Sequence, residues 1–417
     1  MKMQANTKER TSFLILLFAF FAIVFRFIPG FDYDFYCFYT WAINIKNDGL
    51  GMAYNKTDIN YLPFYQYVLY IYGKIAGSEE DIIQSVRLLR LFTLAFEILG
   101  LWYVCKWVGK NASFVVLVFV SLLNLGFSFD TIVWGQVDGI FSAFIFIAFY
   151  YAYKQNMLWS SIWLVLAINA KLQGVIFLPL WFLMCLNNLV IKKNIRAFLL
   201  PLVTVVATQI LILIPFLLQP GQLQKIWGVI TISSKYYPKL SVAAFNLWCL
   251  VMPPDKAFAT PDTGMLIAGI SYKHAGLILF CIFSAAAMLP VVRDVYSTFK
   301  RGENRMINKE RIWLSAAIVS LAFFYFNTEM HERYCHPVLF FLTAYAFHSR
   351  NYFGYIVFSI AYFLNLERVF SGATGSYFFN PDVLWYDIRT IAILYAIVMV
   401  YMFVKLYRLK DKETLVA

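Results

Sequence analysis

The sequence RIWLSAAIVSLAFFYFNTEMHERYCHPVLFFLTAYAFHS, residues 311–349, decides the fold class of this chain. It consists of two apolar runs, 311–327 and 334–348, on either side of the polar group MHERY, residues 330–334. A membrane-spanning helix needs about 20 apolar residues, or about 17 at the short end. Because ionisable residues at the end of a membrane helix are costly to keep, this pattern predicts a membrane protein with a functional site at residues 330–334.

The composition of the whole chain agrees with this interpretation. The 417 residues are 61% hydrophobic, 19% aromatic and 14% charged, and the mean hydropathy is +0.66. These values exclude an ordinary soluble protein. The first apolar stretch, Thr11 to Phe27, is followed by acidic and aromatic residues without a small-residue cleavage site. We therefore expect a retained membrane helix there rather than a signal peptide.

The cysteines and histidines do not have the spacing of a metal site. The six cysteines are scattered without a C-x-x-C pair, and the four histidines form no H-E-x-x-H motif. We expect the cysteines to be packing residues, with a Cys37–Cys335 disulfide as the alternative. No cofactor is predicted, and a divalent metal stays an alternative.

The net charge of +12 is a topological signal. More than half of the 35 lysines and arginines lie in the N-terminal segment, the C-terminal tail from Lys405 and five short loops. Basic short loops are typical of the cytoplasmic side of a membrane protein. The expected partner is therefore the lipid bilayer, and no nucleic-acid partner is predicted.

We predict an all-α polytopic membrane protein with about 12 transmembrane helices and both termini in the cytoplasm. Segment 61–76 must then lie on the membrane, and its tyrosines favour such an interfacial helix. External loops 29–86 and 219–264 would form the rim of the site within a single domain, residues 1–417. The predicted spans are 11–28, 87–107, 112–128, 138–153, 157–172, 174–190, 197–218, 270–292, 311–327, 334–348, 351–367 and 383–406.

Two aspartates follow the first predicted span. Asp32 and Asp34 share a face if the segment is extended and diverge by about 200° if it is helical. A carboxylate near an apolar surface suits a general base that removes a hydroxyl proton, with or without a metal. The alternative is a solvated, acidic helix end.

The motif WGQVD, residues 134–138, lies just before another predicted span on the same side. Asp138 could simply stabilise the start of that helix. The alternative is a binding edge for a sugar, because Trp134 supplies an aromatic face, Gly135 gives room for close approach, and Gln136 and Asp138 supply hydroxyl partners.

His331, Glu332 and Arg333 suggest recognition of a phosphate by Arg333, together with His331. The alternative is an interfacial anchor in which Glu332 pairs with Arg333. Lys171, at the external end of its span, could neutralise the same phosphate or could snorkel to the interface. Glu97 lies inside a predicted span, and we expect it to pair within the bundle.

Five motifs, taken in chain order, resemble those of a known group. Asp34-x6-Trp41 followed by Tyr61-Leu-Pro63 is similar to the Asp-x6-Trp and Tyr-Pro-Pro pair of the lipid-linked glucosyltransferases of N-glycan assembly. WGQVD (134–138), AKLQ (170–173), LSVAAFNLW (240–248) and MHERY (330–334) resemble bacterial mannosyltransferase-like proteins related to the GPI-anchor enzymes. The chain thus resembles the integral-membrane glycosyltransferases of the GT-C type over nearly its whole length, with Leu62 as a departure.

The resemblance implies a GT-C-like bundle that transfers a hexose, with mannose as one option, from a polyprenyl-phosphate-linked donor to a glycan or glycolipid acceptor with inversion at the anomeric carbon. Asp34 would be the base, because its offset to Trp41 fits better than that of Asp32, with Asp138 as a further catalytic candidate. The donor phosphate would bind Arg333, His331 and Lys171. The expected substrate contacts are Gln136, Trp134, Glu332, Tyr237, Asn246 and Tyr61.

The competing function is a polytopic transporter or flippase for a lipid-linked or small polar substrate. Transporters typically show internal repeats and a site near the middle of the membrane. Here the polar residues gather at one face and no repeat is visible, which favours the transferase. The Lys/Asn/Ile-rich usage hints at a bacterium, so we expect the cytoplasmic (inner) membrane, with the active site facing outward.

Overall fold

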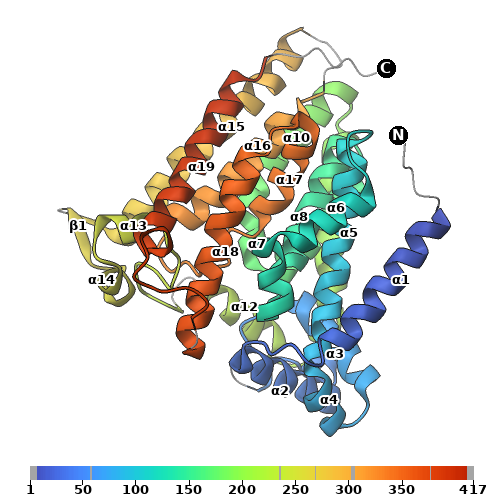
Figure 1. The fold of residues 1–417 in the computed structure, drawn as a ribbon. Coiled ribbons are helices and arrows are strands. Elements are labelled where there is room, and N and C mark those ends of the chain that lie inside the picture. Colours follow the sequence, from blue (N-terminus) through green and yellow to red (C-terminus); the bar gives the residue numbers. More distant parts are fainter. Residues whose placement is uncertain are drawn as a thin grey trace.

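The computed structural model describes residues 7–56, 59–233, 236–267, 269–301, 306–375 and 377–410. The described residues are 77% helical. Figure 1 shows a bundle of long helices with a group of shorter helices, α2 to α4, at one end. The N-terminal part contains α1 (Thr7–Val24), α2 (Asp32–Asp48), η1 (Leu50–Met52), α3 (Pro63–Ala76), α4 (Glu79–Ser85), η2 (Val86–Leu89) and α5 (Arg90–Val108).

The central part of the chain is a run of helices joined by short turns. Its most buried member is α8, in which nearly every side chain lies inside the bundle. The elements are α6 (Phe114–Leu123), α7 (Leu125–Ser128), η3 (Phe129–Trp134), α8 (Asp138–Tyr153), α9 (Met157–Ala170), η4 (Leu172–Phe177), α10 (Leu178–Lys192) and α11 (Arg196–Leu217).

The C-terminal part begins with a segment of short elements and continues with five helices, α15 to α19. A two-stranded antiparallel hairpin in that segment departs from the all-α prediction. The elements are α12 (Gln222–Ile232), α13 (Leu247–Val251), α14 (Pro254–Ala259), β1 (Met265–Ile267), β2 (Ile270–Ser271), α15 (Tyr272–Arg301), α16 (Lys309–Phe326), α17 (Pro337–Ser349), α18 (Phe353–Thr374), η5 (Leu384–Tyr386) and α19 (Ile388–Arg408).

Eleven of the twelve predicted spans overlap chiefly with one helix each, and the span 112–128 is divided between α6 and α7. By length and composition, six helices of the described residues can cross a membrane, or seven if the bent pair α6 and α7–η3 counts as one. The chain is therefore a multi-pass membrane protein, and the number twelve stays a prediction. Three further apolar helices, α8, α9 and α17, are shorter, with 16, 14 and 13 residues.

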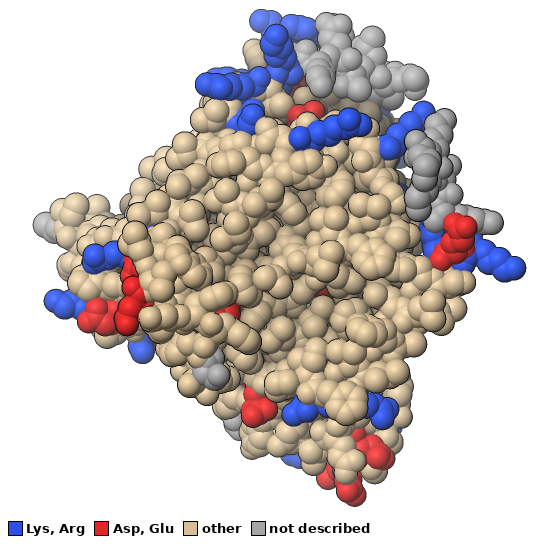
Figure 2. Space-filling model, in the orientation of Figure 1, with Lys and Arg blue, Asp and Glu red and all other residues tan. Residues whose placement is uncertain are grey.

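The surface and the core have the distribution expected in lipid. Helices α11 and α15 expose apolar side chains such as Val203 and Leu211, whereas α8 and α17 are buried against α5 and α16. Figure 2 shows charged side chains at the top and at the lower edges of the molecule, with a wide uncharged surface between them. Such a band suits contact with the hydrocarbon layer.

The prediction of a straight span over 112–128 is wrong. Helix α6 ends at Leu123, and the chain bends by 78° into α7 and η3. Asn124 stands at the bend, where its side-chain oxygen accepts a hydrogen bond of 3.3 Å from the backbone N–H of Phe127 and its amide donates one of 2.7 Å to Ser359. An asparagine that starts a new helix in this way ends the previous one.

Loop 29–86, predicted to be external, is largely helical, because α2, α3 and α4 all lie between α1 and α5. Helix α3 begins at Pro63, which suits a first helical position. Tyr65 and Leu69 of α3 are buried against the rest of the protein. The position of these helices at the membrane interface stays a prediction.

The predicted topology can be tested by labelling single cysteines in a background without the six native ones, all of which are free thiols in the structure. We expect cysteines at Tyr237 and Tyr377 to react with a membrane-impermeant maleimide in intact cells. Cysteines at Lys110 and Lys193 should react only after permeabilisation, since basic loops stay in the cytoplasm. A label at 237 that reacts only from the inside would contradict the threading.

Candidate active site

Asp34 lies in the first turn of α2 and is tied to the segment before α8. One of its carboxylate oxygens accepts hydrogen bonds from the Trp134 indole N–H at 3.1 Å and from the Gln136 amide at 2.5 Å. The backbone N–H of Phe31 also donates to the Trp134 carbonyl at 3.2 Å. Asp32, on the same helix, is exposed. Because α2 is helical, the two aspartates diverge, and only Asp34 faces the motif at residues 134–138.

A tight turn aims Trp134 and Gln136 at Asp34. The backbone N–H groups of Gly135 and Gln136 both donate to the Asp130 carbonyl, at 3.0 and 2.9 Å. Gly135 has φ +90, and a Cβ there would come within 2.6 Å of the Phe35 ring. Only glycine fits both requirements, which explains its place inside this motif.

Asp138 is the second acidic group of the site, and its carboxylate contacts two cations. One oxygen forms an ion pair with the Lys171 ammonium, and the other lies 3.4 Å from the Arg333 guanidinium. The Lys171 ammonium also lies over the Tyr334 ring, 4.0 Å from its centre. Asp138 is buried and does not cap α8 through its side chain.

The polar group at residues 331–333 lies in the turn between α16 and α17. Arg333 donates to the neighbouring Glu332 at 2.6 Å, so the pairing considered from the sequence is present. The His331 ring lies 4.8 Å from the Tyr237 ring. The Val242 N–H donates to the Met330 carbonyl at 2.9 Å, which holds loop 219–264 against this turn.

The charges of these groups follow from burial and from their neighbours. Burial raises the pKa of Asp34, and the Arg333 charge and the Trp134 hydrogen bond offset part of that rise. Burial also opposes ionisation of Glu332, but Arg333 and His331 bring the pKa of Glu332 down to about 2. Burial lowers the pKa of His331. At neutral pH, Glu332 is therefore ionised and His331 is neutral.

Tyr61 joins the same charged region from the segment before α3. Burial raises the pKa of its hydroxyl well above the usual value, and the charges of Arg333, Asp34 and Asp138 act on the same group. Its carbonyl accepts a hydrogen bond of 3.0 Å from the Tyr54 hydroxyl, which fixes the turn into α3.

Asn246 does not join these groups. Its side chain is fully buried, caps α13 through the Trp248 N–H at 3.2 Å, and donates to the Phe324 carbonyl at 3.2 Å. The structure therefore gives this residue a role in attaching the external loop to α16. The other predicted residues, from Tyr61 to Arg333, gather around Asp34 and Asp138.

The sequence analysis missed a buried ionic group beneath the site. The His336 ring lies between two carboxylates, 3.4 Å from Glu97 and 3.6 Å from Asp130. It also makes a hydrogen bond of 3.1 Å with the Tyr362 hydroxyl. Glu97 pairs inside the bundle as predicted. The only sequence signal for His336 was its place three residues after Arg333, directly before an apolar run.

Two buried amide oxygens of the site, Gln136 Oε1 and Gln173 Oε1, have no hydrogen-bond partner among the described residues. Asp138 Oδ2 and Arg333 Nε also make no hydrogen bond there, but they face each other at 3.4 Å as an ion pair. Native proteins pair most such atoms, so the two unpaired amide oxygens favour the binding of a polar ligand or of water. Within the described ranges, no three His, Cys, Asp or Glu side chains are arranged to hold a metal ion.

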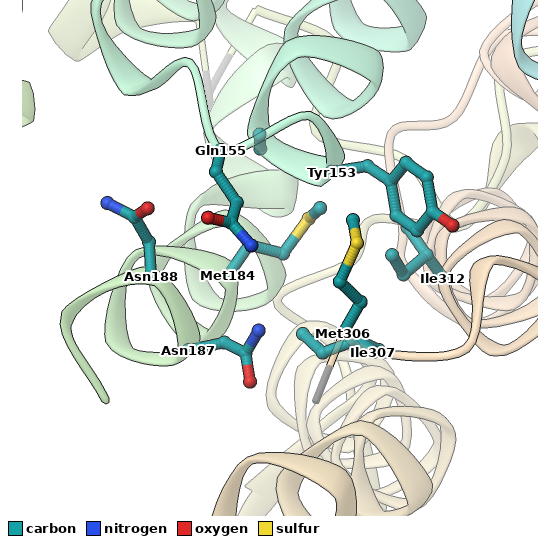
Figure 3. Close-up of a pocket in the computed structure, with 9 residues that line it drawn as sticks. Tyr153, Gln155, Met184, Asn187, Asn188, Met306, Ile307 and Ile312 are labelled. Atoms are coloured by element: carbon teal, nitrogen blue, oxygen red, sulfur yellow. The ribbon is translucent and has the colours of Figure 1, made fainter. Parts of the chain in front are cut away.

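A small cavity lies at the opposite end of α8 from Asp138. Tyr153, Gln155, Met184 and Asn187 are among the residues that line it (Figure 3). Its volume is about 10 Å³, roughly the space of one water molecule. It is therefore too small for a substrate.

Comparison with known proteins bears on this site directly. Residues 61–244 match the family model described as Glycosyltransferase family 87, a family of GT-C-type membrane glycosyltransferases that use polyprenyl-phosphate sugars. The predicted resemblance is thereby confirmed. No curated protein matches the chain. The matched segment contains Tyr61, Trp134, Gln136, Asp138, Lys171 and Tyr237 and leaves out Asp34 and residues 331–333.

Proposed function

We propose that this chain is a membrane glycosyltransferase that moves a hexose, with mannose as one candidate, from a polyprenyl-phosphate carrier to a glycan or glycolipid acceptor. The reaction takes place at the outer face of a bacterial cytoplasmic membrane and inverts the anomeric carbon. The observation that carries the proposal is that a half-buried carboxylate, Asp34, and an arginine, Arg333, lie in one polar cluster with Asp138.

Asp34 is the proposed base. Its carboxylate is held in place by Trp134 and Gln136 through a single oxygen, which leaves the second oxygen for a substrate proton. Burial raises its pKa towards neutrality, and a base is most effective when its pKa lies near the working pH.

Arg333 and Lys171 are the proposed phosphate ligands. Arg333 donates one N–H to Glu332, and its Nε faces the Asp138 carboxylate at 3.4 Å. Because a guanidinium has five N–H donors, the remaining ones can serve phosphate oxygens. Neutral His331 can add one further N–H donor.

In the proposed reaction, one bond forms as another breaks. The acceptor oxygen attacks the anomeric carbon from the face opposite the carrier phosphate, and its proton passes to Asp34. The electron pair of the breaking bond goes to the phosphate oxygen, where Arg333 and Lys171 stabilise the charge. A single displacement of this kind inverts the configuration at the carbon.

The acid limb of the pH–rate profile should respond to Trp134. Asp34 must be ionised to accept a proton, so activity falls as the pH drops through its pKa. The hydrogen bond from the Trp134 N–H lowers that pKa, and Trp134→Phe removes this hydrogen bond. We expect the limb of kcat/KM to move to higher pH in Trp134→Phe and to stay in place in Trp163→Phe, a control on α9. If the acid limb of Trp134→Phe lies at the same pH as in the parent protein, the titrating group is not Asp34.

The reaction can be tested in proteoliposomes that contain the purified protein and a polyprenyl-phosphate hexose labelled in the sugar. We expect label to appear in an added acceptor and free polyprenyl phosphate to accumulate in equal amount. Label that crosses the bilayer still attached to its carrier, without transfer, would instead support a flippase.

A further inference from the structure

A basic cavity lies far from the proposed active site. It has a volume of about 450 Å³ and lies between the ends of α15 and α19. Helix α15 starts at Tyr272, next to the external hairpin, and ends at Arg301 beside the cavity. Its 30 residues correspond to about 45 Å, which separates the cavity from the external loops by the depth of a membrane.

The floor of the cavity is an ion pair that joins three helices. Arg311, in the first turn of α16, pairs with Asp294 of α15 and donates to the Leu409 carbonyl just after α19 at 3.0 Å. Both side chains are largely buried. Both residues of this pair line the cavity.

The rim carries positive charge that nothing in the described structure balances. Arg293, Arg301 and Lys410 line the cavity and are exposed. None of the three has a hydrogen bond or ion pair with a described residue. Three cations around one cavity favour the binding of an anion.

Exposed aromatic side chains lie beside the cavity. Tyr296 and Phe299 are 61% and 70% exposed on α15, and Tyr407 is 48% exposed on α19. The Tyr407 hydroxyl donates to the Ala286 carbonyl of α15 at 2.8 Å, which holds the two helices together beside the opening. Aromatic side chains at helix ends are typical of the headgroup level of a bilayer.

We propose that this cavity binds the headgroup of an anionic phospholipid in the cytoplasmic leaflet. The phosphate lies among Arg293, Arg301 and Lys410, Ser297 offers a hydroxyl to the headgroup, and the acyl chains follow the apolar surface of α15. Basic pockets between membrane helices on the cytoplasmic side suit such headgroups. The proposal depends on the basic loops being cytoplasmic and is independent of the transfer reaction.

Native mass spectrometry of the detergent-purified, full-length protein tests this site. We expect phosphatidylglycerol to stay bound under conditions that remove phosphatidylcholine. The double variant R293Q and R301Q should bind phosphatidylglycerol about 20- to 30-fold more weakly, at about fivefold for each basic residue. The control variant K110Q and R196Q removes the same charge from two other basic loops and should bind as the parent does.

Three results would overturn the proposal. Equal retention of the two lipids would show that the charge of the headgroup is not recognised. Equal binding by the double variant and the control variant would place the lipid elsewhere. Displacement of phosphatidylglycerol by millimolar inorganic phosphate would identify a site for free phosphate rather than for a lipid.

Discussion

Replacing Asp34 by asparagine should lower the rate of sugar transfer by about 10²- to 10⁴-fold, the usual loss when a general base is removed. Asparagine keeps the size of the side chain and an oxygen that can accept the hydrogen bonds from Trp134 and Gln136. It cannot take a proton from the acceptor. We therefore expect normal protein levels and normal donor binding together with a collapsed kcat.

Asp32→Asn is the matched control. It makes the same chemical change two residues away on the same helix, at an exposed side chain. Transfer should remain close to the parent rate. If the Asp32 variant is inactive and the Asp34 variant is active, the two roles must be exchanged.

Arg333→Ala is expected to have the second large effect, and it acts in two ways. It removes charge-assisted hydrogen bonds to the donor phosphate, which should raise the donor KM about 10- to 100-fold. It also leaves Glu332, whose side chain is only 3% exposed, without its cation. Breaking a buried ion pair typically costs about 3–5 kcal/mol, so the melting temperature should also fall.

A double variant separates these two effects. In Arg333→Ala with Glu332→Gln the unpaired carboxylate is gone, so the melting temperature should recover while donor affinity stays low. Arg333→Lys keeps the charge and loses the planar fork, and we expect it to restore little donor affinity. Full rescue by lysine would show that a point charge is sufficient. Parent-like donor affinity in the double variant would remove Arg333 from phosphate binding.

The helices could be predicted because hydropathy is a local property. Eleven of the twelve apolar segments each correspond chiefly to one helix, at nearly the predicted place. The bend at Asn124 could not be predicted in this way, because the apolar run 112–128 is continuous. Helix α6 ends there because the Asn124 side chain makes hydrogen bonds with Phe127 and Ser359.

The clustering of the candidate residues could be predicted in part, and their contacts could not. Threading brought Asp34, Asp138 and Arg333 to one face, and the offset to Trp41 favoured Asp34 over Asp32, but that only Asp34 faces residues 134–138 follows from the helical geometry of α2. His336 was missed because a lone histidine before an apolar run gives no sign of the carboxylates that three-dimensional packing brings to it.

The shortness of three helices has a consequence for the depth of the proposed site. Helices α8, α9 and α17 hold Asp138, Lys171 and Arg333 at or near one end, and their 16, 14 and 13 residues correspond to about 24, 21 and 20 Å. The hydrocarbon layer is about 30 Å thick. Because α8 and α17 are buried inside the bundle, longer neighbouring helices face the lipid and the short ones can end below the level of the water boundary. The carrier phosphate would then react in a recess of the protein, at the depth of the hydrocarbon layer, and the acceptor would have to enter that recess to meet it.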